Sequence, residues 1–208
     1  LGVVSQGQHP WQSTPMYSAL IEISQPTLAT DETLHTTLTD LMAAQTVQNA
    51  LIAENLSQAE QFWRMREQIS AAQKAQGKNI KHDVSVPISA IAQFIERTDV
   101  ALAQKYHGIQ TVVFGHIGDG NVHFNVSAGT AFANPDALMA HESVINQMVY
   151  EHVQVFNGSI SAEHGIGLLK RELMNSIKSN VELQTMRAIK HALDPHNRMN
   201  PHKIFSDS

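Results

Sequence analysis

The stretch from Gly115 to Val126, GHIGDGNVHFNV, contains two histidines at a spacing that could bind a metal ion. Asp-Gly between two strand-like runs is a strong signal for a two-residue type I′ hairpin turn, because that turn needs positive φ at both central residues. With Asp119 and Gly120 as this turn, His116 would face His123 across the hairpin. Directly opposed residues have Cβ atoms about 4.5–5.5 Å apart, so both imidazoles could reach one ion. A hydrogen-bonded pair of imidazoles explains the spacing equally well.

A second stretch, SAEHGIGLLKRE at 161–172, places a carboxylate directly beside an imidazole. Adjacent residues in an extended segment point in opposite directions, so Glu163 and His164 are not expected to bind one ion symmetrically. A bend at Gly165 would let Glu163 bind a metal while His164 faces a substrate. Two histidines and one carboxylate leave open positions on an ion, which then acts as a Lewis acid. A salt bridge within the loop is the simpler alternative.

The chain has no cysteine, so a metal would be held by nitrogen and oxygen ligands. Zinc, manganese and ferrous iron all suit such ligands, and the prediction puts zinc first. The same ligand set, His116, His123 and Glu163 with His164 as base, would also suit a self-contained metal-dependent hydrolase or lyase.

A third cluster lies in FWRMREQIS, at 62–70, where Arg66 and Ser70 are four residues apart. This spacing puts two side chains next to each other on a helix, so they could bind a carboxylate together. The alternative is that Arg66 pairs with a nearby glutamate on a solvated helix face.

The elements that must position these residues follow from hydrophobic periodicity and capping signals. Hairpin-connected strands without a Gly-rich strand-to-helix turn favour an α+β fold over a doubly wound one. We predict an antiparallel sheet with helices on one face, arranged like a ferredoxin-like cap domain, and a C-terminal helical segment. The predicted strands are 16–23, 83–86, the two arms of the hairpin and 158–162, and the predicted helices are 31–44, 58–76 (capping box Ser57/Glu60), 88–105, 135–156 and 180–193 (capping box Ser179/Glu182).

Composition excludes several classes of protein. The 208 residues are 42% hydrophobic and 16% charged, and the net charge of −5 comes without a Lys/Arg cluster that could neutralise phosphates, which argues against nucleic-acid binding. No run of about 18 apolar residues predicts a membrane span, and no signal peptide is recognisable. A cytoplasmic location is therefore expected, with peripheral membrane association left open.

Taken together, these motifs resemble the C-terminal domain of FAD-linked oxidases, the family of D-lactate dehydrogenases, the glycolate oxidase flavin subunit and D-2-hydroxyglutarate dehydrogenases. The resemblance covers nearly the whole chain, and the hairpin and AEHG motifs are its most specific parts. The matching segments are YSALIEIS, FWRMREQIS, KHDVSVP, GHIGDGNVHFNV, SAEHGIGLLKRE and ALDPHNRMNPHKIF.

The resemblance implies a role for each matching position. The metal ligands would be His116, His123 and Glu163, and His164 would be the base. The substrate carboxylate contacts would be Arg66, Ser70, Lys81 and Asn125. Ser70 stands where the hydroxyglutarate branch has threonine. Asn200 would lie near the flavin, although an Asn-Pro turn explains it as well.

The resemblance also implies FAD as cofactor, with a small 2-hydroxy acid oxidised to a 2-oxo acid. It leaves the electron acceptor open and allows a homodimer. In the family an FAD-binding domain with a Gly-rich loop precedes this region, and no such loop occurs in these residues. The chain is therefore expected to be a fragment, with a substrate domain at 1–160 and a segment at 161–208 that packs toward the FAD domain. A non-catalytic interaction domain with packed histidines is the remaining alternative.

Overall fold

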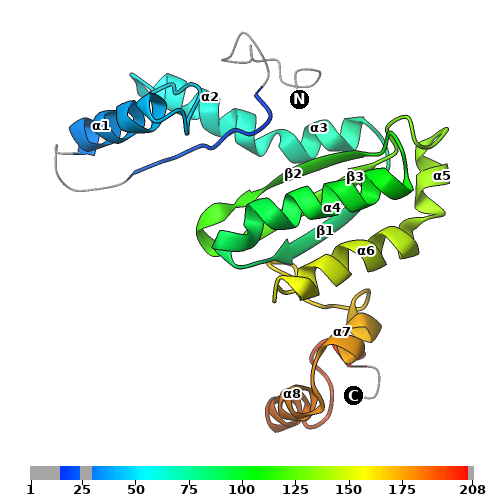
Figure 1. Cartoon of the computed structure of the whole chain (residues 1–208). Helices are drawn as coiled ribbons and strands as arrows, with labels where there is room; N and C mark the ends of the chain where they lie inside the picture. Colours follow the sequence, from blue (N-terminus) through cyan, green and yellow to red (C-terminus); the bar gives the residue numbers. More distant parts are fainter. Residues whose placement is uncertain (1–14, 24–29, 206–208) are drawn as a thin grey trace. The chain divides into compact units, whose positions relative to one another are not determined.

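The computed structural model describes residues 15–23 and 30–205 and divides the chain into two compact units, Leu1–Gly77 and Lys78–Ser208. The predicted boundary after residue 160 falls within the second unit and stays a prediction. The described elements are α1 (Thr30–Ala43), α2 (Leu56–Glu67), α3 (Ile69–Ala75), β1 (Ile80–Ser85), η1 (Ile88–Ala90), α4 (Ile91–Lys105), β2 (Gln110–His116), η2 (Ile117–Asp119), β3 (Asn121–Ser127), α5 (Pro135–Met139), α6 (Glu142–Val155), α7 (Arg171–Ile177) and α8 (Asn180–Leu193) (Figure 1).

In the first unit, three sequence predictions are wrong. Residues 15–23 have no regular secondary structure, because an extended segment becomes a strand only by pairing with another strand, and the described part of this unit contains helices alone. The helix predicted at 58–76 is two helices separated at Gln68. Its N-cap is Asn55, whose side chain accepts the N–H of Gln58, so the predicted capping box at Ser57 does not form the helix start.

The second unit is built on a three-stranded antiparallel sheet in the order β1-β3-β2. The helix α4 connects β1 to β2, and β3 lies between these two strands, which is a split β-α-β arrangement. The predicted strand at 158–162 is reduced to one bridge, in which Ser85 and Ser159 exchange backbone hydrogen bonds of 2.8 and 3.0 Å. A ferredoxin-like β-α-β-β-α-β unit has its fourth strand after the second helix, and Ser159 likewise follows α6 and bridges to β1. The predicted α+β class is confirmed.

Local capping signals fix several helix starts. Asn134 caps α5 by accepting the N–H of Ala137, as the Asn-Pro sequence predicts. The predicted helix to residue 156 is interrupted at 140–141, so α5 and α6 are separate. The capping box of Ser179 and Glu182 is present in full at the start of α8.

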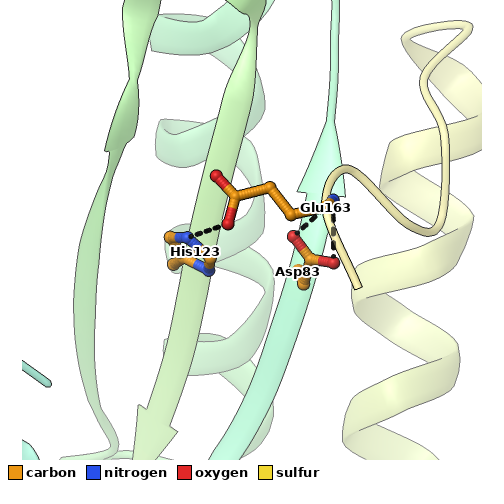
Figure 2. Close-up of side chains that lie close together, drawn as sticks. All are labelled: Asp83, His123 and Glu163. Atoms are coloured by element: carbon orange, nitrogen blue, oxygen red, sulfur yellow. Dashed lines mark hydrogen bonds and ion pairs between the residues drawn. The ribbon is translucent and has the colours of Figure 1, made fainter. Parts of the chain in front are cut away.

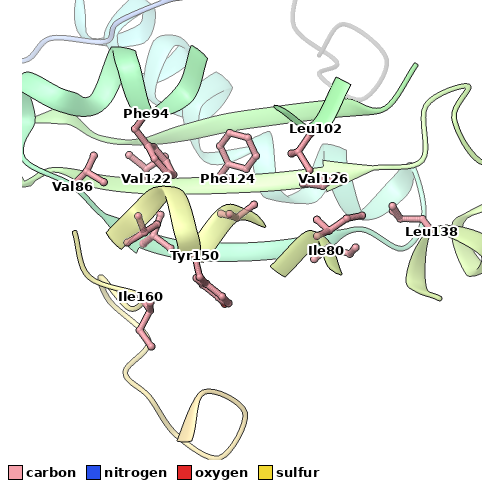
Figure 3. Packing of buried hydrophobic residues seen from close by; sticks show 14 residues of the cluster. Ile80, Val86, Phe94, Leu102, Val122, Phe124, Val126, Leu138, Tyr150 and Ile160 are labelled. Atoms are coloured by element: carbon pink, nitrogen blue, oxygen red, sulfur yellow. The ribbon is translucent and has the colours of Figure 1, made fainter. Parts of the chain in front are cut away.

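The main core lies between one face of the sheet and the helices α4 and α6 (Figure 3). Alternate residues of β1 and β3 point into it, which is the period-2 pattern of a strand with one apolar face. The rings of Phe94 on α4 and Phe124 on β3 meet edge to face with centroids 5.9 Å apart. A second, smaller hydrophobic cluster consists of Met174 of α7, Leu183 of α8 and Phe205. No helix within 15–23 or 30–205 is long and apolar enough to cross a membrane.

One residue of the core face is a histidine, His82 on β1, whose side chain is 1% exposed. Its Nδ1 lies 2.8 Å from the carbonyl oxygen of Phe124, and its ring meets Tyr150 edge to face. Burial lowers the pKa of His82 to about 4, because the charged imidazolium is poorly solvated in the core.

This lowered pKa makes the folded state sensitive to acid. Above about pH 6.5 His82 is neutral in both states, and below it the unfolded chain takes up the proton first. We expect the free energy of unfolding to fall by about 3 kcal/mol between pH 6.5 and 4 because of this residue. Urea unfolding at pH 7 and pH 5 measures the effect, and His82→Phe should be less stable at pH 7 but show a smaller loss at pH 5. An equal loss in both proteins would contradict the assignment.

Candidate active site and metal centre

A group of polar residues of the sheet lies on the face that points away from the main core. Asp83 of β1 pairs with His123 of β3, and two residues further along β3 Asn125 pairs with Lys81. Paired residues in an antiparallel sheet point to the same side, so these four side chains lie on one face. Lys81 is exposed, whereas Asp83 and Asn125 are buried. Strand alternation thus separates the candidate site from the core.

The predicted hairpin register is wrong. His116 pairs with Asn121, and Phe114 pairs with His123, with ring centroids 4.9 Å apart. The loop therefore has four residues, Ile117–Gly120, instead of the two predicted. The pairing moves by an even number of residues, so His116 still lies on the same face as His123, but diagonally and not opposite it.

The contacts of the loop explain its length. Gly120 has φ +77, and its N–H bonds to the carbonyl of Ile117. A Cβ at Gly120 would lie 2.3 Å from the carbonyl oxygen of Val86, so this position requires glycine. The Asp119 side chain accepts the N–H of Asn121 at 3.0 Å. The Asp-Gly pair therefore ends the loop, whereas a two-residue turn would have placed it at the centre.

Three potential ligands converge on this face: Asp83, His123 and Glu163, each offering an atom within 4.8 Å of the others (Figure 2). Glu163 reaches from the loop before α7, with Oε2 3.7 Å from Nε2 of His123. Its Oε1 accepts a hydrogen bond from Nδ2 of Asn121. Two ligand atoms at about 2.1 Å from one tetrahedral ion lie about 3.4 Å apart, so the pair of His123 and Glu163 fits a common ion. His116 is not in this group of three.

Asp83 holds the backbone of the same loop. Its Oδ2 accepts the N–H of His164 at 2.8 Å and that of Glu163 at 3.1 Å. Burial opposes ionisation of this carboxyl, but the two N–H groups and the nearby His164 and Lys170 charges outweigh it and lower the pKa of Asp83 below its usual value. Asp83 is thus ionised whenever the protein is near neutral pH.

One ring nitrogen of His164 lies beside a carboxylate, whereas most of the side chain is exposed to solvent. Its Nδ1 lies 3.4 Å from Oδ2 of Asp83, while its side chain is 70% exposed. A carboxylate at Nδ1 favours the tautomer with the proton on Nδ1, which leaves a lone pair on Nε2. The His123 and His164 ring centroids are 6.0 Å apart. The predicted ligand and the predicted base are therefore neighbours.

Three further predicted residues are Arg66, Ser70 and Asn200. Arg66 lies in the last turn of α2 and Ser70 in α3, so both belong to the first unit and are described with it. Because the helix breaks at Gln68, the continuous-helix spacing assumed for them does not apply. Asn200 has φ +50 in the turn near the C-terminus, where its carbonyl accepts the N–H of Lys203. This conformation matches the Asn-Pro turn.

Sequence reasoning missed Asp83 and Asn121 as parts of the site. Asp83 was assigned only to a strand, although its position two residues after Lys81 puts both on the same face. Asn121 would have emerged in the same way from its spacing to His123. The alternation was thus the available signal.

Comparison with known proteins gives a consistent picture. The family model described as FAD linked oxidases, C-terminal domain, matches residues 3–204. The chain is 44% identical over 159 residues to D-2-hydroxyglutarate dehydrogenase of Xanthomonas citri pv. viticola, covering 76% of this chain and 33% of that protein. It is 32% identical to D-2-hydroxyglutarate dehydrogenase of Stutzerimonas stutzeri over 95% of the chain and 42% of the relative. It is 33% identical to the mitochondrial D-2-hydroxyglutarate dehydrogenase of Arabidopsis thaliana over 97% of the chain and 34% of the relative.

The chain thus spans between 33% and 42% of the length of these three relatives. Their names do not favour the alternatives of a self-contained metal-dependent hydrolase or lyase and of a non-catalytic interaction domain. The match over 3–204 covers nearly every residue, including the hairpin and the loop that carry the clustered side chains. The chain belongs to the family of FAD-linked oxidase C-terminal domains.

Proposed function

We propose that this chain is the substrate- and metal-binding portion of an FAD-dependent D-2-hydroxyacid dehydrogenase, which oxidises a 2-hydroxy acid to a 2-oxo acid. The observation that carries the proposal is the juxtaposition of His123 and Glu163 with the open imidazole of His164 on one sheet face. The names of the relatives support a hydroxy acid as substrate.

We propose that His123 and Glu163 hold a divalent metal, with His116 as the third ligand and zinc as the first choice of ion. The 3.7 Å separation of the nitrogen and oxygen atoms supports the first two ligands. His116 lies on the same face at the end of β2. When bound, the ion supplies Lewis acidity that lowers the pKa of a substrate hydroxyl.

His164 is the proposed base. Nδ1 faces the Asp83 carboxylate, so Nε2 is the atom that takes the hydroxyl proton of the substrate. Asp83 stabilises the imidazolium that results, since it remains ionised. FAD, when bound, accepts the hydride from the substrate carbon.

The proposed contacts of the substrate carboxylates are cationic, amide and hydroxyl side chains. Lys81 and Asn125 form a cross-strand pair beside Asp83 and His123, which supports a substrate position along this face. The resemblance adds Arg66 and Ser70 of the first unit to the same role. A guanidinium and an ammonium would neutralise an acidic substrate.

Asn200 is proposed near the flavin, and the cytoplasmic location and the homodimer stay predictions.

The test is made on the protein in which this chain is joined to its FAD-binding domain. D-lactate, D-malate and D-2-hydroxyglutarate are mixed anaerobically with the enzyme, and flavin reduction and bound metal are measured together. We expect reduction by at least one of these acids. In His123→Ala we expect a loss of metal of at least about tenfold and slower reduction by at least about a hundredfold.

His107→Ala is the matched control, because this exposed histidine lies in the turn at the opposite end of β2 from His116. It should keep the metal content and the rate of the wild type. His116→Ala tests the third ligand in the same assay. A flavin that no 2-hydroxy acid reduces would refute the proposed function, and unchanged metal in His123→Ala would refute the ligand assignment.

A further inference from the structure

The loop at 160–164 is held to β1 by contacts of two residues, Asp83 and Lys170. Asp83 is 4% exposed, and its Oδ2 accepts hydrogen bonds from the N–H of Glu163 and His164. Its Oδ1 shares the Glu163 N–H at 3.2 Å, and the hydroxyl of Ser161 lies 3.4 Å from Oδ2. One carboxylate therefore receives two successive backbone N–H groups.

Lys170 fastens the other end of the same loop. Its Nζ donates to the carbonyl oxygen of Ile160 at 2.6 Å and to that of Asp83 at 3.2 Å. The ammonium also lies 5.9 Å from the centre of the Tyr150 ring. A half-buried ammonium with two carbonyl acceptors joins the backbone of β1 to the backbone of the loop.

This attachment decides where the two neighbouring side chains point. In a regular extended segment Glu163 and His164 would lie on opposite sides. Here both N–H groups converge on Asp83, and Gly165 follows with φ +75. The Glu163 carboxylate consequently reaches His123 and Asn121, while the His164 ring stays beside Asp83 with an exposed edge.

We propose that Asp83 and Lys170 are positioning residues, which hold the loop so that Glu163 lies at the metal position and His164 at the position of the base. The catalytic consequence rests on the proposed function, whereas the attachment itself does not. Asp83 thus acts through the loop backbone in addition to its contact with the His164 ring, and its side chain lies near those of His123 and Glu163.

Hydrogen exchange of the Glu163 and His164 amides measures the attachment directly. Asp83→Asn keeps one acceptor oxygen, removes the negative charge and replaces the other oxygen with an NH2 group. We expect these two amides to exchange about tenfold faster or more, because the acceptor that they share is no longer charged. The amides of β3 should keep their protection. Unchanged exchange at both positions would overturn the proposal.

Asp99→Asn is the matched control. Asp99 is a partly buried carboxylate on α4 that accepts the Thr111 hydroxyl at 2.8 Å, so the same change of charge is made at a different place in the unit. It should leave the loop amides unaltered. Faster loop exchange in Asp99→Asn would mean that any lost carboxylate loosens the unit, and this would overturn the specific role of Asp83.

Lys170→Met and Lys170→Arg test the attachment from the other side and do not alter β1, so they remain informative if Asp83→Asn does not fold. Lys170→Met should speed loop exchange, and Lys170→Arg, which keeps a cation with several donors, should restore part of the protection. Equal exchange in these two variants would contradict a role for the ammonium.

Kinetics of the FAD-containing protein then test the consequence for catalysis. Asp83→Asn should lower kcat, normalised to bound FAD, by about 10–100-fold with a smaller change in KM, because the displaced groups act on the reacting atoms. An unchanged kcat despite faster loop exchange would overturn the positioning role. A wild-type enzyme without hydroxy acid oxidation would refute the proposed function instead, and the exchange result would still decide the attachment.

Discussion

His164→Asn is expected to slow flavin reduction by a 2-hydroxy acid by about 10²–10⁴-fold, which is the usual contribution of a general base. The physical reason is that one nitrogen of the imidazole faces a carboxylate while the side chain is largely exposed. Nδ1 faces the Asp83 carboxylate at 3.4 Å, so Nε2 is the atom left to take a proton. Asparagine keeps an N–H donor for Asp83 but offers no basic nitrogen. The rate is measured by anaerobic stopped flow on the FAD-containing protein.

Metal content separates this effect from damage to the metal site. Glu163 and His123 are unaltered in His164→Asn, so the bound metal should match the wild type. His191→Asn, an exposed histidine on α8, is the matched control and should keep the full rate. A rate reduced less than about tenfold would rule out His164 as the base. Loss of metal together with the rate would show that His164 serves the metal site.

The parts of the fold that sequence predicted correctly depend on local interactions. The capping box of Ser179 and Glu182 and the Asn134 cap each involve residues within a few positions of one another, so the sequence contains the whole interaction. Alternation in β3 predicted which residues share a face. The strand predicted at 16–23 failed because a strand also needs a partner, which periodicity does not supply.

The hairpin register shows where local rules stop. Asp-Gly was correctly identified as part of the connection, but the number of residues in the loop depends on Gly120 packing against the Val86 carbonyl and on Asp119 bonding to the N–H of Asn121. The first of these contacts comes from another part of the chain. Because the register moved by an even number, His116 and His123 kept their common face but lost their direct opposition.

For the candidate site, too, the sequence indicated the residues of local motifs but not the long-range contacts that position them. The motifs indicated His123, Glu163 and His164, which the structure brings together. They did not indicate that Asp83 receives the backbone of the AEHG loop, because that contact joins residues 80 and 81 positions apart. Residue types that could do chemistry are visible in a sequence, whereas the groups that position them depend on tertiary contacts.

Phe124→Ala is expected to lower the free energy of unfolding by about 3–5 kcal/mol, the usual cost of truncating a fully buried phenylalanine. Phe124 is 0% exposed and lies on β3, the central strand of the sheet. Its ring meets those of Phe94 and His82 edge to face, so truncation leaves a cavity between sheet and helices. Urea unfolding followed by circular dichroism measures the loss.

The same substitution tests whether the core face of β3 supports the polar face. Phe124 lies between His123 and Asn125 in sequence but points to the opposite side, so a cavity behind the strand loosens the positions of both polar residues. Metal affinity should therefore fall in Phe124→Ala, although no ligand is removed.

Val100→Ala on the exposed side of α4 is the control and should change stability by less than about 0.5 kcal/mol. A loss below about 1 kcal/mol in Phe124→Ala would contradict the packing between the sheet and its helices. Unchanged metal affinity despite a full loss of stability would show that the loop and the strand edges position the ligands without help from the core.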